Sequence, residues 1–282
     1  MVLAMISWGI AWPNAKIINS YFDFYDLVFL RFAFGSLTLL PFILFSFRDI
    51  RLENNFLVYV IPTSLLFLFY NLSFFMGTYY GDAGKGAVFA TTTNPIITYI
   101  IMLGISLKTN KRDMFGIIAG LIGGIIIMDV FNLGLMNVIR IENIFFPICS
   151  LIWGGMTVFT SYAQRKMSPL LFVFLCYFLT TLMSWPLSSI TLEELKNLDM
   201  NFYLNFFMVS VASMGFGTTV YIFATKILGP VKSSAYIFSV PFVALISANL
   251  ILGEVIHLST ILGGLICLIS VYIINIYKKD IK

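Results

Sequence analysis

Charged side chains are scarce in this chain of 282 residues. Asp, Glu, Lys and Arg together make up 11% of it, against roughly 25% in soluble proteins. The set AVILMFWYC reaches 60%, whereas soluble domains average roughly 45–50% even when Gly is counted. So few polar side chains do not cover the surface of a water-soluble globule. The composition therefore excludes a soluble enzyme and indicates a protein of the lipid bilayer.

Residues suited to metal binding or to nucleotide hydrolysis are also few. The three cysteines, Cys149, Cys176 and Cys267, lie inside apolar runs without paired spacing, which argues against a disulfide framework and a Cys-based zinc site. A lone histidine, His257, does not make a His-rich metal site. No GxxxxGK[ST] phosphate-binding loop occurs, so ATP is not the energy source within this chain. We expect no cofactor, no metal and no enzymatic activity.

Long apolar runs make up most of the chain. A helix needs about 20 apolar residues to cross the hydrocarbon core of a membrane, and helices satisfy their own backbone there. The sequence predicts an all-α integral membrane protein with ten transmembrane helices. The runs are residues 1–18, 26–47, 56–77, 84–104, 113–131, 143–162, 169–188, 203–224, 232–252 and 258–277.

Lys and Arg lie mainly in alternate gaps between these runs, which sets the orientation. With the N-terminus inside, the inner gaps and tail hold Arg48, Arg51, Lys108, Lys111, Arg112, Arg165, Lys166, Lys226, Lys232, Lys278, Lys279 and Lys282. The outer gaps hold only Lys85, Arg140 and Lys196. We therefore predict a multi-pass protein of the cell (inner) membrane with both termini cytoplasmic. The net charge of +4 is explained by this topology, so no nucleic-acid partner is expected.

The chain repeats itself after about 145 residues. Trp8-Gly9 recurs as Trp153-Gly154, Pro41 as Pro186 and Pro95 as Pro241, and Gly116 and Gly263 each open a small-residue stripe in the last run of their half. Each half, 1–131 and 141–277, then has five runs. Because five is odd, the second half enters from the opposite side, so the repeats are inverted. Inverted repeats are common in secondary transporters, although channels also contain them.

Several of these landmarks resemble the EamA domain of the drug/metabolite transporter superfamily. They are Trp8-Gly9-Ile10-Ala11-Trp12-Pro13-Asn14-Ala15-Lys16, Arg31-Phe32-Ala33-Phe34 and Thr93-Asn94-Pro95, with Trp153, Ser239-Val240-Pro241 and Gly253-Glu254 in the second half. The resemblance covers the whole chain as two tandem domains. It implies a ten-helix carrier with cytoplasmic termini, often an exporter of amino acids, other metabolites or drugs. Leu107-Lys108 stands at the first half's counterpart of Gly253-Glu254, so that acid is not shared between the halves.

Arg31 is the charge within a predicted span that most needs a reason. A charge at mid-helix costs about 2.5–3.5 kcal/mol on insertion scales, and Arg31 lies roughly 8 Å inward from Asp26 at 1.5 Å per residue. One interpretation is an anchor that reaches back to the membrane surface, or an ion pair between helices. The other is a contact to a substrate carboxylate or a gate.

Two further features are candidates for gating or for a break in a helix. Asp82 and Lys85 bracket the start of the fourth run among three glycines, which fits either a tight external turn or a flexible gate. Pro95 lacks the N–H that would bond the carbonyl of Thr91, and Pro241 is its counterpart in the second half.

The fourth run carries a polar stretch at mid-depth, where transporter sites tend to lie. Its hydroxyl and amide groups, with the carbonyls freed by Pro95, could bind a solute, or the hydroxyls could only satisfy the kinked helix. Aromatic residues with polar neighbours or repeat partners complete an expected aromatic-walled cavity, which suits amphipathic organic solutes. The predicted substrate-binding residues are Trp8, Trp12, Asn14, Tyr70, Asn71, Thr91, Asn94, Trp153, Tyr221 and Ser239.

The stripe Gly116-xxx-Gly120-xxx-Gly124 on the fifth run allows helices to approach closely. It fits either packing within a monomer or the interface of a homodimer.

These features together predict a secondary carrier for small organic metabolites, with amino acids first among them and export the expected direction. Two inverted halves would work by alternating access. A channel-like facilitator is the alternative, although no ring of charge or repeated filter motif supports it. No Asp or Glu sits at mid-span, whereas proton-coupled carriers usually keep a buried carboxylate, so uniport or exchange is expected.

Overall fold

The protein is described by a computed structural model that covers residues 1–45, 55–81, 83–106, 111–127, 144–164, 167–253 and 258–275. The elements within these ranges are helices, as the continuous apolar runs predict. The first half forms α1 (Val2–Ile18), α2 (Phe24–Phe45), α3 (Leu57–Tyr80), α4 (Ala83–Ser106) and α5 (Lys111–Ile127).

The second half is less regular than the first. It begins with α8 (Phe145–Ala163) and α9 (Pro169–Ser184), which ends in a 3-10 turn, Trp185–Leu187. A short α10 (Leu192–Lys196) follows, and α11 (Met200–Phe207) then runs through a π-helix at Met208–Thr218, hereafter the π segment, into α12 (Thr219–Leu228). The chain ends with α13 (Pro230–Ala235), a 3-10 turn at Tyr236–Ser239, α14 (Val240–Leu252) and α15 (Leu258–Asn275).

Gly and Pro residues determine where several of these helices stop. Gly229 and Gly253 have positive φ angles of 81° and 71°, a conformation that Gly adopts without strain, and they end α12 and α14. Pro230 then starts α13 at a position where its missing N–H is not needed. The repeat-related prolines differ locally: Pro95 lies inside a continuous α4, whereas Pro241 follows the 3-10 turn at the start of α14.

Seven helical stretches are long and apolar enough to cross a membrane. They are Phe24–Phe45, Leu57–Tyr80, Gly86–Ile105, Phe145–Ala163, Pro169–Leu187, Met200–Leu228 and Pro230–Leu252. Two apolar stretches, Val2–Ile18 and Ile261–Asn275, are shorter, and α5 has 17 residues. At 1.5 Å per residue, 17 residues span about 25 Å, less than the roughly 30 Å hydrocarbon core. The described residues thus contain seven of the ten predicted spans at full length.

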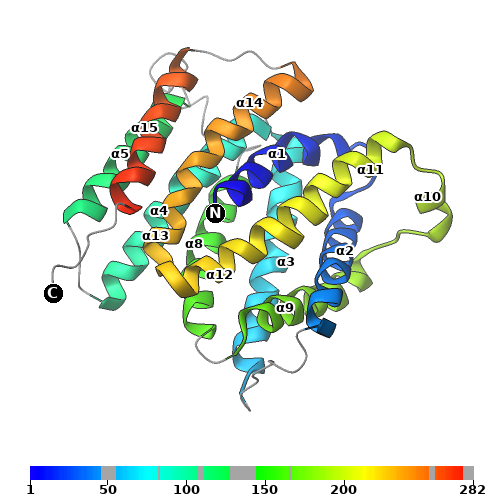
Figure 1. The fold of residues 1–282 in the computed structure, drawn as a ribbon. Coiled ribbons are helices and arrows are strands. Elements are labelled where there is room, and N and C mark those ends of the chain that lie inside the picture. The colour runs from blue at the N-terminus through cyan, green and yellow to red at the C-terminus, as the bar shows by residue number, and fades with distance from the viewer. Residues whose placement is uncertain are drawn as a thin grey trace.

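Helices of the two halves interlock instead of forming separate bundles. In sequence order, α1 corresponds to α8, α2 to α9, α3 to α11–α12, α4 to α13–α14 and α5 to α15. The contacts follow this match: α1 packs on α14 as α8 packs on α4, and α3 packs on α8 as α1 packs on the π segment. α2 packs on its own counterpart α9, and α5 on α15, which lie side by side at one edge of the molecule (Figure 1).

The glycine stripe on α5 is used inside the chain. A Cβ built on Gly116 would lie 2.4 Å from Ile274, one on Gly120 would lie 2.4 Å from Phe238, and one on Gly124 would lie 2.5 Å from Thr92. Of the two interpretations of this stripe, the structure therefore shows packing within the monomer.

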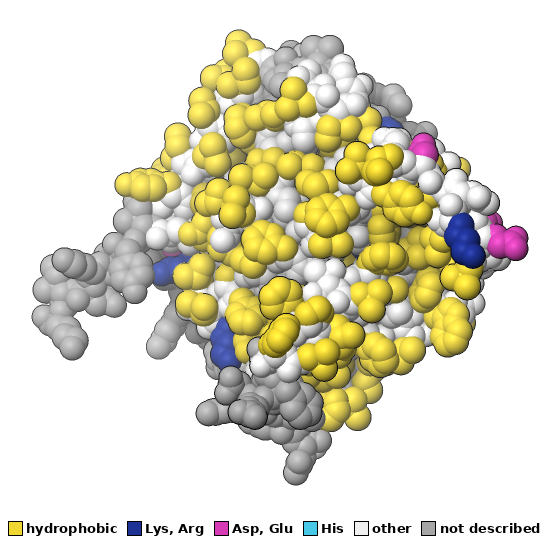
Figure 2. Space-filling view, turned by 45° about the vertical axis from the view of Figure 1, so that its right-hand side comes forward, with side chains coloured by type: hydrophobic (Ala, Val, Ile, Leu, Met, Phe, Trp, Pro, Cys, Tyr) yellow, Lys and Arg dark blue, Asp and Glu magenta, His cyan; other side chains and the backbone are white. Residues whose placement is uncertain are grey.

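The outside of the molecule is apolar. Hydrophobic side chains cover most of the face in Figure 2, and the Lys, Arg, Asp and Glu side chains in view lie toward its margins. Large apolar residues such as Phe45 and Leu250 are 91% and 78% exposed. Such a surface is stable against lipid and not against water. Polar side chains such as Arg31, Asn71 and Asn94 are instead buried inside.

Candidate functional site

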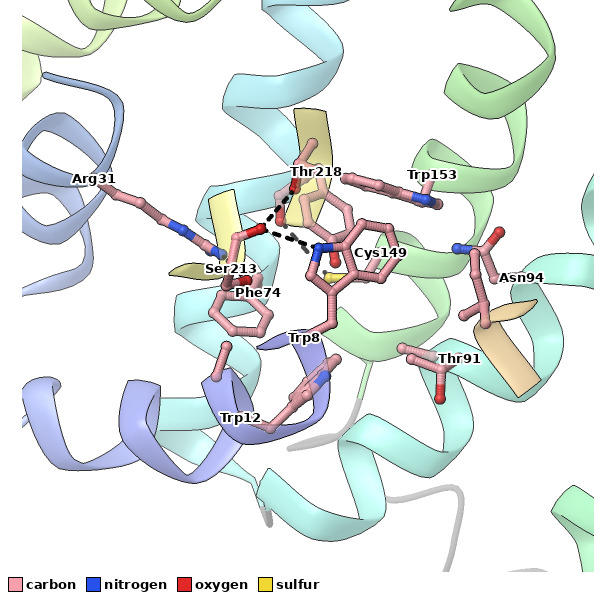
Figure 3. Close-up of a pocket in the computed structure, with 14 residues that line it drawn as sticks. Trp8, Trp12, Arg31, Phe74, Thr91, Asn94, Cys149, Trp153, Ser213 and Thr218 are labelled. Atoms are coloured by element: carbon pink, nitrogen blue, oxygen red, sulfur yellow. Dashed lines mark hydrogen bonds between the residues drawn. The ribbon is translucent and has the colours of Figure 1, made fainter. Parts of the chain in front are cut away.

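A small cavity lies where helices of the two halves meet (Figure 3). Its volume is about 40 Å³, which is room for a few waters. It is lined by Trp8, Ala11, Trp12, Arg31, Tyr70, Phe74, Ala90, Thr91, Asn94, Cys149, Trp153, Ser213, Thr218 and Ile237.

Aromatic rings form the cavity walls. The repeat-related residues Trp8 and Trp153 meet edge to face, with ring centroids 5.0 Å apart and planes at 88°. Tyr70 packs against Trp153 at 4.6 Å, and Trp12 packs against Phe74 at 4.8 Å. The pairs of Trp8 with Trp153 and of Trp12 with Phe74 have the edge-to-face arrangement that aromatic rings prefer, and Tyr70 is tilted against Trp153. The aromatic walls of the cavity therefore come from α1, α3 and α8.

Arg31 reaches the cavity from α2 and is 6% exposed. Its Nη1 donates to Asn71 Oδ1 at 2.8 Å, its Nε to the Val209 carbonyl at 3.2 Å and its Nη2 to Ser213 Oγ at 3.4 Å. Asn71 is itself oriented, since its Nδ2 donates to the Phe67 carbonyl. The guanidinium thus bridges α3 of the first half and the π segment of the second.

The structure does not support the anchor and ion-pair interpretations of Arg31. A surface anchor would reach the headgroup region, but the guanidinium lies buried beside the cavity. Asp26, the nearby acid on α2, instead accepts hydrogen bonds at its Oδ1 from Ser188 Oγ and from the backbone N–H groups of Ser189 and Ile190, at 2.6, 2.8 and 3.2 Å. Asp26 therefore binds the loop after α9 and does not form an ion pair with Arg31.

The π segment faces the cavity and is held by donors from other helices. In addition to the bond from Arg31 to the Val209 carbonyl, Trp8 Nε1 donates to the Ser213 carbonyl at 3.2 Å, and the Tyr177 hydroxyl donates to the Met214 carbonyl at 3.0 Å. π-Helical turns are rare and occur frequently at functional sites. Here side chains from α1, α2 and α9 stabilise the wider turn through its carbonyl groups.

One buried polar atom at the cavity, Asn94 Oδ1, lacks a hydrogen-bond partner within the described part of the chain, and a second, Trp153 Nε1, has only the Tyr221 hydroxyl within its reach. An unsatisfied buried group costs about 1–3 kcal/mol, and a bound solute could satisfy both. The neighbouring threonines differ: Thr91, Thr92 and Thr93 donate to carbonyls four residues earlier, those of Ala87, Val88 and Phe89. These hydroxyls bond their own helix, and Thr93 Oγ1 also lies 2.6 Å from Ser150 Oγ of α8, so this stretch both satisfies its helix and joins α4 to the other half.

Comparison with known proteins identifies the chain. Residues 1–129 and 140–276 each match the EamA-like transporter family. The chain belongs to this family. It is therefore a membrane transporter of the drug/metabolite transporter superfamily. The chain is also similar to a protein of known crystal structure, with 12% sequence identity and a TM-score of 0.69. The match covers 97% of this chain and 95% of the other chain, which shows a shared fold. No curated protein matches the chain.

Six of the ten residues predicted to bind substrate line the transporter's cavity, and Arg31 lines it too; the six are Trp8, Trp12, Tyr70, Thr91, Asn94 and Trp153. The other four do not line it. Asn71 holds Arg31, and Tyr221 packs on Trp8 with its hydroxyl 2.9 Å from Thr157 Oγ1. Ser239 donates to the Tyr236 carbonyl, and Asn14 is buried in α1. Asp82 and the side chain of Lys85 lie outside the described residues.

Several lining residues of the transporter were not predicted. Phe74 and Cys149 lie four residues from Tyr70 and Trp153 on the same helical faces, so the i, i+4 rule would have found them. Ser213 and Thr218 line the cavity through the π segment, whose hydrogen-bond pattern depends on side chains remote in sequence.

A second, larger cavity of about 610 Å³ lies between α2, α9 and the other face of the π segment and α12. Its lining includes Phe42, Leu170, Phe207 and Phe223 and is almost wholly apolar. Ligand sites need a few placed polar groups to orient a solute. The smaller polar cavity is therefore the candidate transport site.

Proposed function

We propose that this transporter is a secondary carrier that moves small organic metabolites, amino acids or related amphipathic solutes, by alternating access. The observation that carries the proposal is a polar, aromatic-walled cavity formed jointly by the two repeats. Transporter sites commonly lie at such a repeat interface. We further propose ten membrane crossings, an inner-membrane location with both termini cytoplasmic, and export as the physiological direction.

Inverted repeats over residues 1–131 and 141–277 are part of this proposal. Contacts between the halves occur in matched pairs, such as α1 with α14 and α8 with α4, and this is what a two-fold relation between two five-helix units produces. The meeting of Trp8 with its counterpart Trp153 supports an axis that passes through the cavity.

The volume of the cavity favours a carrier over a channel. Sites for organic ligands span about 300–1,000 Å³, whereas about 40 Å³ is open here. The cavity of the described conformation is thus too small for an organic solute, and a solute fits only if the halves separate. Hydrogen bonds of Arg31 and Trp8 to the π segment cross between the halves, so these bonds would break and form in each cycle.

Counterflow tests this proposal. Purified protein in liposomes preloaded with unlabelled amino acids should take up labelled aromatic or aliphatic ones in a saturable manner. Electrical conductance without counterflow would instead support the channel-like facilitator. The same liposomes carrying Trp8→Ala should lose counterflow while the protein inserts normally.

A further inference from the structure

Arg31 places at the cavity a positive charge that lies over the rings of Phe74 and Phe75, at 4.9 and 5.7 Å from their centroids, and that no described acidic side chain balances. All its hydrogen-bond partners are neutral, namely Asn71, Val209 and Ser213. Within the described ranges, no Asp or Glu lines the cavity or pairs with this guanidinium. Arg stays protonated in proteins, and a buried charge is normally paired. The site as described therefore lacks one negative charge.

The free donors of this site match a carboxylate. Arg31 has five N–H groups, and its three bonds leave one on each terminal nitrogen. A guanidinium with both terminal nitrogens available fits the two oxygens of a carboxylate. Trp153 Nε1 is a further donor at the cavity wall, where the Tyr221 hydroxyl is the protein group within its reach. One carboxylate beside the guanidinium would balance its charge, whereas two would bring one negative charge too many.

We infer that the transporter selects solutes that carry a free carboxylate on a small aromatic body, with Arg31 as the counter-charge. This inference rests on the proposed carrier function and names its substrate class. The aromatic body packs against the rings of Trp8, Trp153 and Tyr70, of which Trp153 contacts each of the other two, edge to face with Trp8 and tilted with Tyr70. The carboxylate lies toward Arg31 and Ser213, which close one end of the cavity in Figure 3.

A set of four compounds tests the carboxylate directly. Phenylalanine and N-acetylphenylalanine carry it, and phenylalaninamide and N-acetylphenylalaninamide replace it by a carboxamide, so the amino group varies independently. Binding to purified protein in nanodiscs is followed by tryptophan fluorescence, since three of the four tryptophans line the cavity. Each acid should bind about ten- to hundredfold more tightly than its amide, the range for a hydrogen bond to a charged group.

Two outcomes would overturn the inference: equal affinities of acid and amide, or no binding of either acid. Failure of the carrier proposal looks different. Tight binding of the acids without saturable counterflow of labelled phenylalanine would remove the carrier and leave the carboxylate preference in place. Saturable counterflow of a neutral or cationic solute alone would support the carrier and overturn the carboxylate preference.

Asn71→Asp provides a second test that keeps the size of the side chain and gives up the hydrogen bond from Asn71 Nδ2 to the Phe67 carbonyl. It puts a carboxylate where Oδ1 now accepts from Arg31 Nη1 at 2.8 Å, so the protein neutralises its own charge. The ratio of the affinities for acid and amide should then fall to less than about threefold. Asn201→Asp adds the same charge at an exposed position of α11 and should keep the preference. An unchanged preference in N71D would place the carboxylate elsewhere and overturn the inference.

Discussion

Gly9 of α1 lies against Val243 of α14 so closely that a Cβ on Gly9 would be 2.6 Å from the Cβ of Val243. The counterpart in the other half behaves alike: a Cβ on Gly154 of α8 would lie 2.6 Å from Ile97 of α4. The offsets are 145 and 146 residues. In both pairs, the Gly carbonyl also accepts a hydroxyl from the partner helix, from Ser247 at 3.3 Å and from Thr98 at 3.5 Å. Each half thus joins its first helix to the fourth helix of the other half through a glycine.

Gly9→Ala and Gly154→Ala should each destabilise the folded transporter. The added methyl group meets branched side chains close to their backbone, and overpacking of this kind costs about 1–3 kcal/mol. Thermal unfolding of purified protein in detergent measures the loss.

Gly155→Ala is the matched control, because nothing lies within 4 Å of a Cβ at that position. It should leave the unfolding temperature unchanged or slightly higher, since Ala favours the helix over Gly. If all three variants unfold at the same temperature, the close contacts between α1 and α14 and between α8 and α4 are wrong.

The sequence predicts the features of this protein that follow a local or periodic pattern, and it does not predict contacts between remote residues. The apolar runs predict helices, and the repeat predicts that Trp8 and Trp153 are equivalent, because both signals are local or periodic. The bonds of Arg31 join it to Asn71, Val209 and Ser213, which lie 40, 178 and 182 residues away. No local pattern encodes such partners. The π segment is not predicted by a local pattern either, since donors from remote helices stabilise its turn.

Trp8→Phe should open the cavity more often. The change keeps an aromatic ring beside Trp153 and removes the indole N–H that donates to the Ser213 carbonyl at 3.2 Å across the halves. That carbonyl still accepts from Thr218 Oγ1, so it is not left unsatisfied. A lost neutral hydrogen bond is worth about 0.5–1.5 kcal/mol, and the open population should rise about two- to twelvefold.

Cys149 reports this opening without any engineered label. It lines the cavity and is fully buried in the described conformation, so a water-soluble thiol reagent reaches it only when the cavity opens. Cys176 and Cys267 do not line the cavity and serve as internal references in the same peptide map. Equal labelling rates of Cys149 in wild type and Trp8→Phe would show that this bond does not hold the halves together.

Transport should be independent of a proton gradient at fixed membrane potential. No carboxylate lines the cavity among the described residues, so no acid there is available to bind a proton. Accumulation in liposomes should persist when the pH difference alone is collapsed. A loss of accumulation under those conditions would show proton coupling through a group outside the cavity.

One carboxylate outside the membrane has a shifted pKa, but it should not disturb this measurement. The backbone N–H and the hydroxyl of Thr191 both bond Glu194 at the start of α10 and hold the pKa of Glu194 below its usual value. Because its pKa is lowered in the folded state, the Glu194 carboxylate contributes to the stability of the fold. This contribution is complete above the usual Glu pKa and is lost as the pH falls through the lowered pKa. Glu194 therefore stays ionised throughout an assay at about pH 6 to 8.

Asn94→Leu should weaken transport without weakening the fold. Asn94 Oδ1 is buried at the cavity and has no partner among the described residues, so an apolar side chain of similar size removes an unsatisfied group and does not destabilise the helix. A solute that bonds this amide loses about 0.5–1.5 kcal/mol, and KM in counterflow should rise about two- to twelvefold. A lower unfolding temperature with unchanged KM would instead make Asn94 a structural residue of α4. Thr91→Val is the comparison for the same helix face: its hydroxyl already bonds the Ala87 carbonyl, so this variant should change KM less than Asn94→Leu does.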